Sequence, residues 1–168
     1  MKARLLFLIL ILSLPCSCVV LREQAISIEL RDHVTSWEVR LAYEEPVKRS
    51  NYFVFTRISE VRVEDGENLS CSVESKRIGT LVLCNDVNSN NITYRFLAHG
   101  LITSMGKAKR FSYAFPITTP TRRLVVLVKL PLGAAIVDES KLRELGMRAI
   151  SPEGAIVTSD GRRILVKW

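Results

Sequence analysis

Apolar and polar positions alternate along most of this 168-residue chain, which is the pattern of strands that bury one face. Between 36 and 43, apolar residues from Trp37 to Tyr43 occupy the odd positions and mostly polar residues the even ones. The same alternation predicts further strands over 26–31, 53–63, 92–99, 111–115, 124–130 and 164–168. We expect the 53–63 strand to slip its register near Ser59. The run 124–130 is apolar at both sets of positions, which favours a central strand covered on both faces.

Turn residues between these runs agree with the strand assignment. Asp160-Gly161 is a typical two-residue hairpin connection, because glycine accepts positive φ. A turn there predicts that Val157 pairs with Ile164 and Ala155 with Val166. The only helical pattern is 139–145, which ends at Gly146.

These elements together predict an all-β fold. About nine or ten strands at short, regular spacing are typical of an antiparallel β-sandwich of the immunoglobulin-like or Greek-key type. The length suits one domain, which we place at 22–168. A content of 48% hydrophobic and 24% charged residues excludes a disordered chain.

The first residues have the organisation of an export signal. Lys2 and Arg4 precede an aliphatic run that reaches Leu14, and small residues follow Pro15. We therefore interpret 1–21 as a signal peptide or, if uncleaved, an N-terminal membrane anchor. Cys16 or Cys18 is a candidate for lipidation after cleavage. Each alternative sends the remaining chain to the extracellular side or the cell surface.

The chain is basic, with a formal net charge of +7. Its densest basic positions suggest a contact patch, which we assign to Lys107, Lys109, Arg110, Arg122 and Arg123. Outside the cell, such a surface favours solubility or attraction to anionic head groups and acidic glycans. Aromatic residues do not alternate with these cations as base stacking requires, so we expect no nucleic-acid partner.

Two cysteines remain beyond the leader. Cys71 and Cys84 flank a pattern of two short strands with a polar reversal near Ser75. An even pair in an oxidising compartment predicts a disulfide. Asn68 and Asn91 each begin an N-x-S/T sequon in a polar, loop-like stretch, so both are candidate glycosylation sites.

The C-terminal third has a distinctive sequence pattern of turn and strand residues. Leu130-Pro-Leu-Gly-Ala134 ends a strand, Ser151-Pro-Glu-Gly-Ala155 begins one, and Ser159-Asp-Gly-Arg-Arg-Ile164 precedes Trp168. This pattern resembles that of an extracytoplasmic β-sandwich domain of archaeal membrane proteins. In those proteins the domain is followed by a transmembrane helix and a cytoplasmic winged-helix module. The resemblance implies an exported domain that senses or binds something outside the membrane. Since the sequence ends at Trp168, we expect the regulator function itself not to carry over.

The candidate chemistry is sparse. His33 and His99 are the two histidines, and no Gly-x-Ser-x-Gly elbow, phosphate loop or metal-ligand spacing accompanies them. We therefore predict a non-enzymatic protein without cofactor or metal, which binds an unidentified extracellular ligand or protein partner. One alternative is a structural subunit of a surface layer or filament, with 24–31 as the donor strand. The other is a hydrolase, which requires His33 or His99 within hydrogen-bond reach of a serine or acid in a cleft.

Overall fold

The computed structural model describes residues 19–65, 69–105, 108–113, 115, 119–131, 156–159 and 163–167, and these form strands and connections. The strands are β1 (Leu21–Leu30), β2 (Val34–Val54), β3 (Ile58–Glu64), β4 (Ser70–Lys76), β5 (Gly79–His99), β6 (Ile102–Met105), β7 (Ala108–Phe111), β8 (Leu124–Lys129), β9 (Ile156–Ser159) and β10 (Arg163–Lys167). The all-β prediction is confirmed. The helix expected at 139–145 lies outside the described residues.

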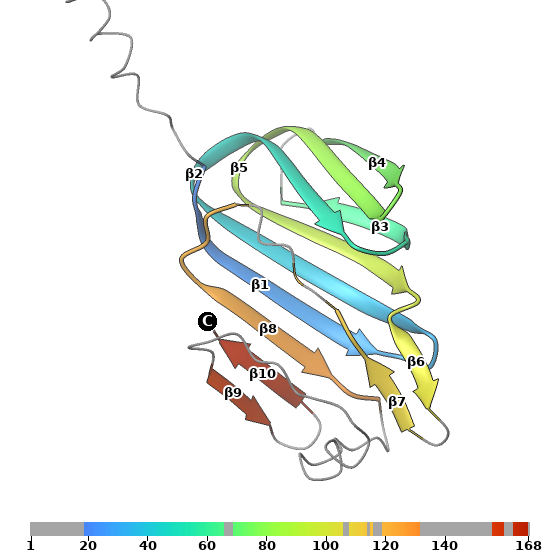
Figure 1. Ribbon diagram of the computed structural model, residues 1–168. Coiled ribbons are helices and arrows are strands. Elements are labelled where there is room, and N and C mark those ends of the chain that lie inside the picture. Colours follow the sequence, from blue (N-terminus) through green and yellow to red (C-terminus); the bar gives the residue numbers. More distant parts are fainter. Residues whose placement is uncertain are drawn as a thin grey trace, which may run out of the picture.

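One large sheet supplies both layers of the fold (Figure 1). Its strand order is β3-β5-β2-β1-β8-β10-β9, and β4 also pairs with β5. We call the layer that contains β1 and β8 the lower layer; it also contains β10, β9, the first half of β2, the second half of β5 and, through its pairing with that half of β5, β3. The upper layer contains the second half of β2, the first half of β5, and β4. β6 and β7 form a separate two-stranded sheet.

The fold-over occurs where β2 and β5 both become irregular. The β2–β5 register shifts between Ala42 and Val47, around Pro46, which has no backbone N–H to donate to the ladder. On β5, Asp86 and Asn88 adopt positive φ at the same level. Bulges of this kind bend a strand and increase its twist. Each of these two 21-residue strands thereby passes from one layer into the other.

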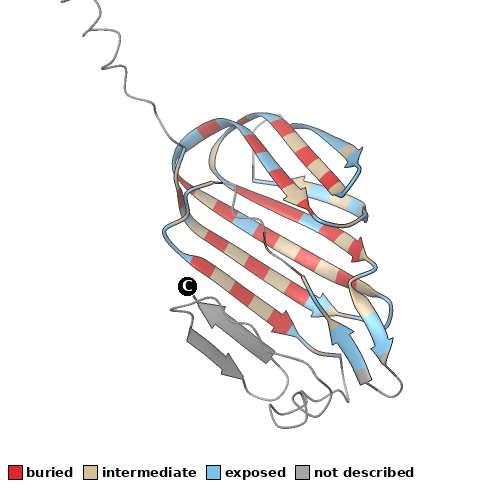
Figure 2. Cartoon of the chain, viewed as in Figure 1, coloured by how far each residue is buried: buried red, intermediate tan, exposed pale blue. Residues whose placement is uncertain are grey.

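The core lies between the two layers, on their facing sides. Buried and partly exposed residues alternate along the strands, as the sequence predicts (Figure 2). Across the core, Tyr52 of the upper layer stacks on Tyr94 of the lower layer at 5.6 Å between ring centroids. We call the core side of each strand the inner face and the opposite side the outer face.

An aromatic cluster covers the lower part of the inner face. Trp37 is 2% exposed and contacts Phe96, Tyr113 and Phe115, with ring centroids 4.8–5.9 Å apart. Its indole N–H donates to Thr35 Oγ1 at 2.6 Å. Tyr113 and Phe115 follow β7 outside a strand, so the predicted 111–115 strand was wrong except at Phe111, where β7 ends.

Several strand boundaries and registers differ from the sequence predictions. Phe53 belongs to the end of β2, while Val61 and Val63 belong to β3, which does slip register after Ser59. β8 is central, between β1 and β10. It pairs with β1 in parallel, and the β6–β7 hairpin lies between β5 and β8 along the chain.

The C-terminal hairpin also has another register than predicted. Val166 pairs with Val157, and Ile164 pairs with Ser159. The predicted pairing of Val157 with Ile164 was wrong by two residues. A shift of two keeps every side chain on its original face, so the apolar pattern could not distinguish the two registers.

The boundary that we predicted between a leader and the domain falls within the first strand. Leu21, which we placed in the leader, pairs with Tyr43 at the start of β1 and is 4% exposed. Residues 1–18, which include Cys16 and Cys18, lie outside the described residues.

Candidate functional site

The predicted basic patch is divided between the two ends of β1. Near its C-terminal end, Lys109 on β7 contacts Asp32 at 2.8 Å. At the other end, Arg123 lies 3.1 Å from Glu23, and Arg122 lies 2.6 Å from Glu44. Arg110 is exposed on β7, and Lys107 lies outside the described residues. The structure therefore does not bring these cations together, and three of them are already neutralised by acids.

A different charged surface stands on the outer face of the lower layer. The pairing of β1, β2, β5 and β3 sets Ser27 opposite Glu38, Glu38 opposite Arg95, and Arg95 opposite Arg62. On the next row, Lys129 of β8 lies opposite Glu29 of β1. Alternation sends these side chains outward, because their neighbours in sequence fill the core.

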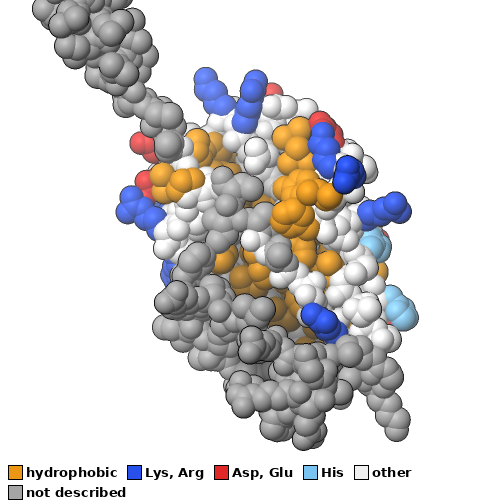
Figure 3. Space-filling model, in the orientation of Figure 1, with side chains coloured by type: hydrophobic (Ala, Val, Ile, Leu, Met, Phe, Trp, Pro, Cys, Tyr) orange, Lys and Arg blue, Asp and Glu red, His pale blue; other side chains and the backbone are white. Residues whose placement is uncertain are grey.

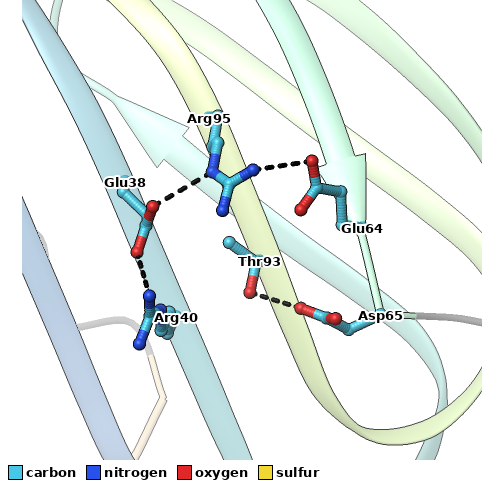
Figure 4. Close-up of polar contacts among 6 residues, drawn as sticks. All are labelled: Glu38, Arg40, Glu64, Asp65, Thr93 and Arg95. Carbon is cyan, nitrogen blue, oxygen red and sulfur yellow. Dashed lines mark hydrogen bonds and ion pairs between the residues drawn. The ribbon is translucent and has the colours of Figure 1, made fainter.

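Ion pairs connect three of these strands (Figure 4). Arg95 Nε lies 3.0 Å from Glu38 Oε2, and Arg95 Nη1 lies 2.7 Å from Glu64 Oε1. The other carboxylate oxygen of Glu38 contacts Arg40 at 2.5 Å. Beside them, Thr93 donates a hydrogen bond to the Asp65 carboxylate at the end of β3.

These contacts control the protonation of Glu38. Partial burial tends to raise the pKa of its carboxyl, but hydrogen bonds from Arg95 and Arg40 outweigh it, and the pKa is lowered overall. Glu38 is therefore a fixed anion that is already shared between two guanidinium groups.

A groove of about 330 Å³ crosses this charged surface from β8 to β3. Its polar lining residues are Ser27, Glu29, Ser36, Glu38, Glu60, Arg62, Arg95 and Lys129. Among the described residues, neither Arg62 nor Lys129 has an ion-pair partner. Glu60, at the bulge of β3, adopts a positive φ of 52°. The groove therefore has one available cation at each end, with the hydroxyl groups of Ser27 and Ser36 on the strands between them.

Sequence reasoning missed this groove. Its residues occupy the polar positions of the predicted strands, so alternation could have marked them as outward-facing. Their assembly depends on the strand order β3-β5-β2-β1-β8, which no local pattern specifies.

The histidines occupy separate positions. His33 lies exposed in the connection between β1 and β2, as a loop histidine. His99 ends β5, and its Nε2 lies 2.8 Å from Ser59 Oγ. Neither Ser59 nor His99 lines the groove, and no carboxylate among the described residues contacts the His99 ring. The hydrogen bond required for the hydrolase alternative is present, but it lies outside this cleft.

The predicted disulfide cysteines and one of the two sequon asparagines lie on β4 and β5. Cys71 lies opposite Cys84 in the β4–β5 pairing, within disulfide-bonding distance and with 4.1 Å between their Cα atoms. Asn91 is exposed on β5, and its side-chain amide donates to Asn90 at 3.0 Å. Asn68 lies outside the described residues.

In the described ranges, no three His, Cys, Asp or Glu side chains gather as a metal site would require. That same part of the chain has no helix with the length and hydropathy needed to span a membrane.

No protein-family model and no curated protein matches the sequence. Among solved structures, an M1 zinc metallopeptidase from Deinococcus radiodurans is similar at a TM-score of 0.43 and 11% identity, over 89% of this chain. A mutant of the M1 zinc metallopeptidase from the same organism, bound to a Tyr-Ser-Ala substrate, gives 0.45 and 9%. The present chain spans 38% of the length of these structures.

Proposed function

We propose that this protein is a non-enzymatic β-sandwich that is exported to the cell surface and binds an anionic, hydroxyl-rich ligand in the outer-face groove. The observation that carries the proposal is the pair of available cations, Arg62 and Lys129, at the β3 and β8 ends of the groove. The leader at 1–21 and the resemblance to extracytoplasmic sensing domains support the exported location.

The groove lining holds three acids and three cations, and the choice of an anion rests on Arg62 and Lys129, which have no ion-pair partner among the described residues. Arg62 is the register partner of Arg95, so the two cationic side chains arise from paired positions on β3 and β5. Glu38 and Glu64 already contact Arg95, whereas Arg62 has no acidic partner among the described residues. An acidic group of a ligand could therefore bind Arg62 with a charge-assisted hydrogen bond. Ser27 and Ser36 offer partners for ligand hydroxyl groups.

The filament alternative loses its proposed donor strand in this arrangement. The segment 24–31 lies largely within β1, which pairs with β2 on one side and β8 on the other. Both edges of that strand are occupied by the protein's own sheet. A filament would have to use another strand for exchange between subunits.

The test is calorimetric titration with oligogalacturonate, an acidic sugar chain, and with a neutral maltooligosaccharide of the same length. We expect binding of the acidic chain only, and loss of binding in R62A/K129A. The matched control K48A/R110A removes two exposed cations outside the groove and should bind as the wild type does. Absence of binding, or equal binding by both double variants, would refute the proposal.

A further inference from the structure

A second surface lies on the outer face of the upper layer, away from the groove. At the end of β2, Tyr52 and Val54 fill the core, whereas Phe53 and Phe55, which directly follows the strand, alternate to the outside. Their rings meet edge to face at 5.0 Å between centroids. With the neighbouring apolar residues of β5 and the β4–β5 turn they form the outer apolar patch, which consists of Phe53, Phe55, Ile78, Leu81 and Leu83.

The strand register makes this patch continuous. Phe53 pairs with Leu81, and the next outward pair of β2 and β5 is Asn51 with Leu83. Ile78 projects from the turn with 63% of its surface exposed, and Phe55 is 43% exposed. Figure 3 shows the corresponding strip of hydrophobic side chains over the upper part of β2 and β5. Such contiguous apolar surface indicates an interaction site.

The rim of the outer apolar patch is basic. Arg57 follows Phe55 by two residues, and Lys76 and Arg77 precede Ile78; all three are exposed. Lys76 contacts Glu74 at 2.5 Å. Within the described residues, Arg57 and Arg77 have no ion-pair partner. Two cations therefore remain available beside exposed aromatic and aliphatic side chains.

We propose that the outer apolar patch docks on an anionic lipid bilayer. Aromatic and aliphatic side chains next to basic ones suit the interface between head groups and acyl chains. A second copy of the chain fits less well, because a two-fold contact would bring the basic rims of both copies together. This proposal concerns another layer of the fold and does not depend on ligand binding in the groove.

The full chain is reconstituted in vesicles of phosphatidylcholine alone or of equal parts phosphatidylcholine and phosphatidylglycerol, and backbone hydrogen exchange is measured. We expect exchange over 53–57 and 77–83 to slow several-fold in the anionic vesicles only. Exchange over 102–111, which carries the exposed Arg110, should be the same in both. Because both vesicles hold the same chain, any anchoring by the leader is common to the two samples.

Variants separate the apolar and the charged contributions. F55S/I78S should lose the lipid-dependent protection. R57E/R77E should abolish it, since each cation near an anionic surface contributes about fivefold in affinity and the loss of two weakens binding by more than about tenfold. K48E/R110E changes charge equally outside the patch and should keep the protection, and unchanged exchange over 92–98 would show that each variant is folded.

Three outcomes would overturn the proposal. Equal protection in both vesicle types would remove the role of lipid charge. Protection that rises with protein concentration in vesicle-free detergent would identify a second copy as the occupant. Protection that persists in R57E/R77E would show that the basic rim does not take part.

Discussion

Arg95 lies between Glu38 and Glu64, and its guanidinium contacts both carboxylates at 3.0 and 2.7 Å (Figure 4). It thereby joins β2, β5 and β3 on the outer face, where the backbone ladder already pairs these strands. Since Glu38 also contacts Arg40, this surface has a fixed pattern of charge. Arg62, which has no ion-pair partner among the described residues, lies opposite Arg95 in the β3–β5 register.

Replacing Arg95 should change the titration of Glu38. Burial tends to raise the pKa of Glu38, and hydrogen bonds from Arg95 and Arg40 lower it below its ordinary value. In R95Q the pKa should therefore rise. A carboxylate with a lowered native pKa stabilises the fold above its unfolded pKa, and this stabilisation is lost as the pH falls through the native pKa. The stability difference between the wild type and R95Q should accordingly shrink from about pH 5 downward.

The measurement is carboxyl-carbon NMR titration, with denaturant unfolding at several pH values. K109Q is the matched control, because Lys109 contacts Asp32 and lowers the pKa of that carboxyl instead. An unchanged Glu38 titration in R95Q would contradict the expected coupling.

Two buried tyrosines should respond differently to loss of the hydroxyl. Tyr94 Oη donates to Ser50 Oγ at 2.6 Å, and Ser50 Oγ also contacts Tyr43 Oη at 2.7 Å. The hydroxyl of Tyr52 is buried and has no partner with hydrogen-bond geometry among the described residues. We expect Y94F to lower the free energy of unfolding by about 1 kcal/mol and Y52F to leave it unchanged or raise it.

Denaturant unfolding of the two variants at neutral pH checks this. Both substitutions keep the aromatic stack of Tyr52 and Tyr94, so each is the packing control for the other. Burial is the main cause that raises the pKa of both hydroxyls. A large loss of stability in Y52F would show that this hydroxyl has a partner after all.

The alternation of side chains made much of the fold predictable. Trp37, Val39, Phe96 and Ala98 were assigned correctly to inward positions because a half-buried strand repeats every two residues. The β4–β5 hairpin was also anticipated, from the two short apolar runs around Ser75. These are local signals, and each needs only a few neighbouring residues.

The long-range arrangement could not be obtained in this way. The bend at Pro46 and Asp86 folds one sheet into two layers, whereas alternation alone suggests two separate sheets. The groove needs Lys129 and Arg62 on the same surface although they are far apart in sequence. Which strands are neighbours is decided by the packing of the whole core, and a single sequence does not display that.

Gly79 should be much less tolerant of a side chain than Gly100. A Cβ at Gly79 would lie 2.1 Å from the carbonyl oxygen of Val54 and 2.9 Å from the ring of Phe53. The backbone of β2 cannot withdraw without breaking its ladder to β5. We expect G79A to lower the free energy of unfolding by about 1–3 kcal/mol or to prevent folding.

Gly100 provides the comparison, because it adopts a positive φ of 73° with no atom within 4 Å of an added Cβ. Asparagine tolerates that conformation better than most residues, so G100N should cost little. Thermal unfolding of both variants measures the contrast. An equal loss of thermal stability in G79A and G100N would mean that the close contact between Gly79 and the Val54 carbonyl relaxes readily.

The pairing of Cys71 with Cys84 predicts a cross-link that stabilises the upper layer. The two residues are 13 positions apart, and closing a loop of about this length restricts the unfolded chain by about 3 kcal/mol. Non-reduced protein should have a mass about 2 Da below that of the reduced form, and C71A/C84A should unfold at lower denaturant concentration. Cys84 is only 1% exposed, so in the single variant C71A its thiol should resist alkylation until the protein unfolds. If Cys71 reacts rapidly with an alkylating reagent in the folded wild-type protein, the bond is absent, and the edge strand β4 is held by its ladder to β5 alone.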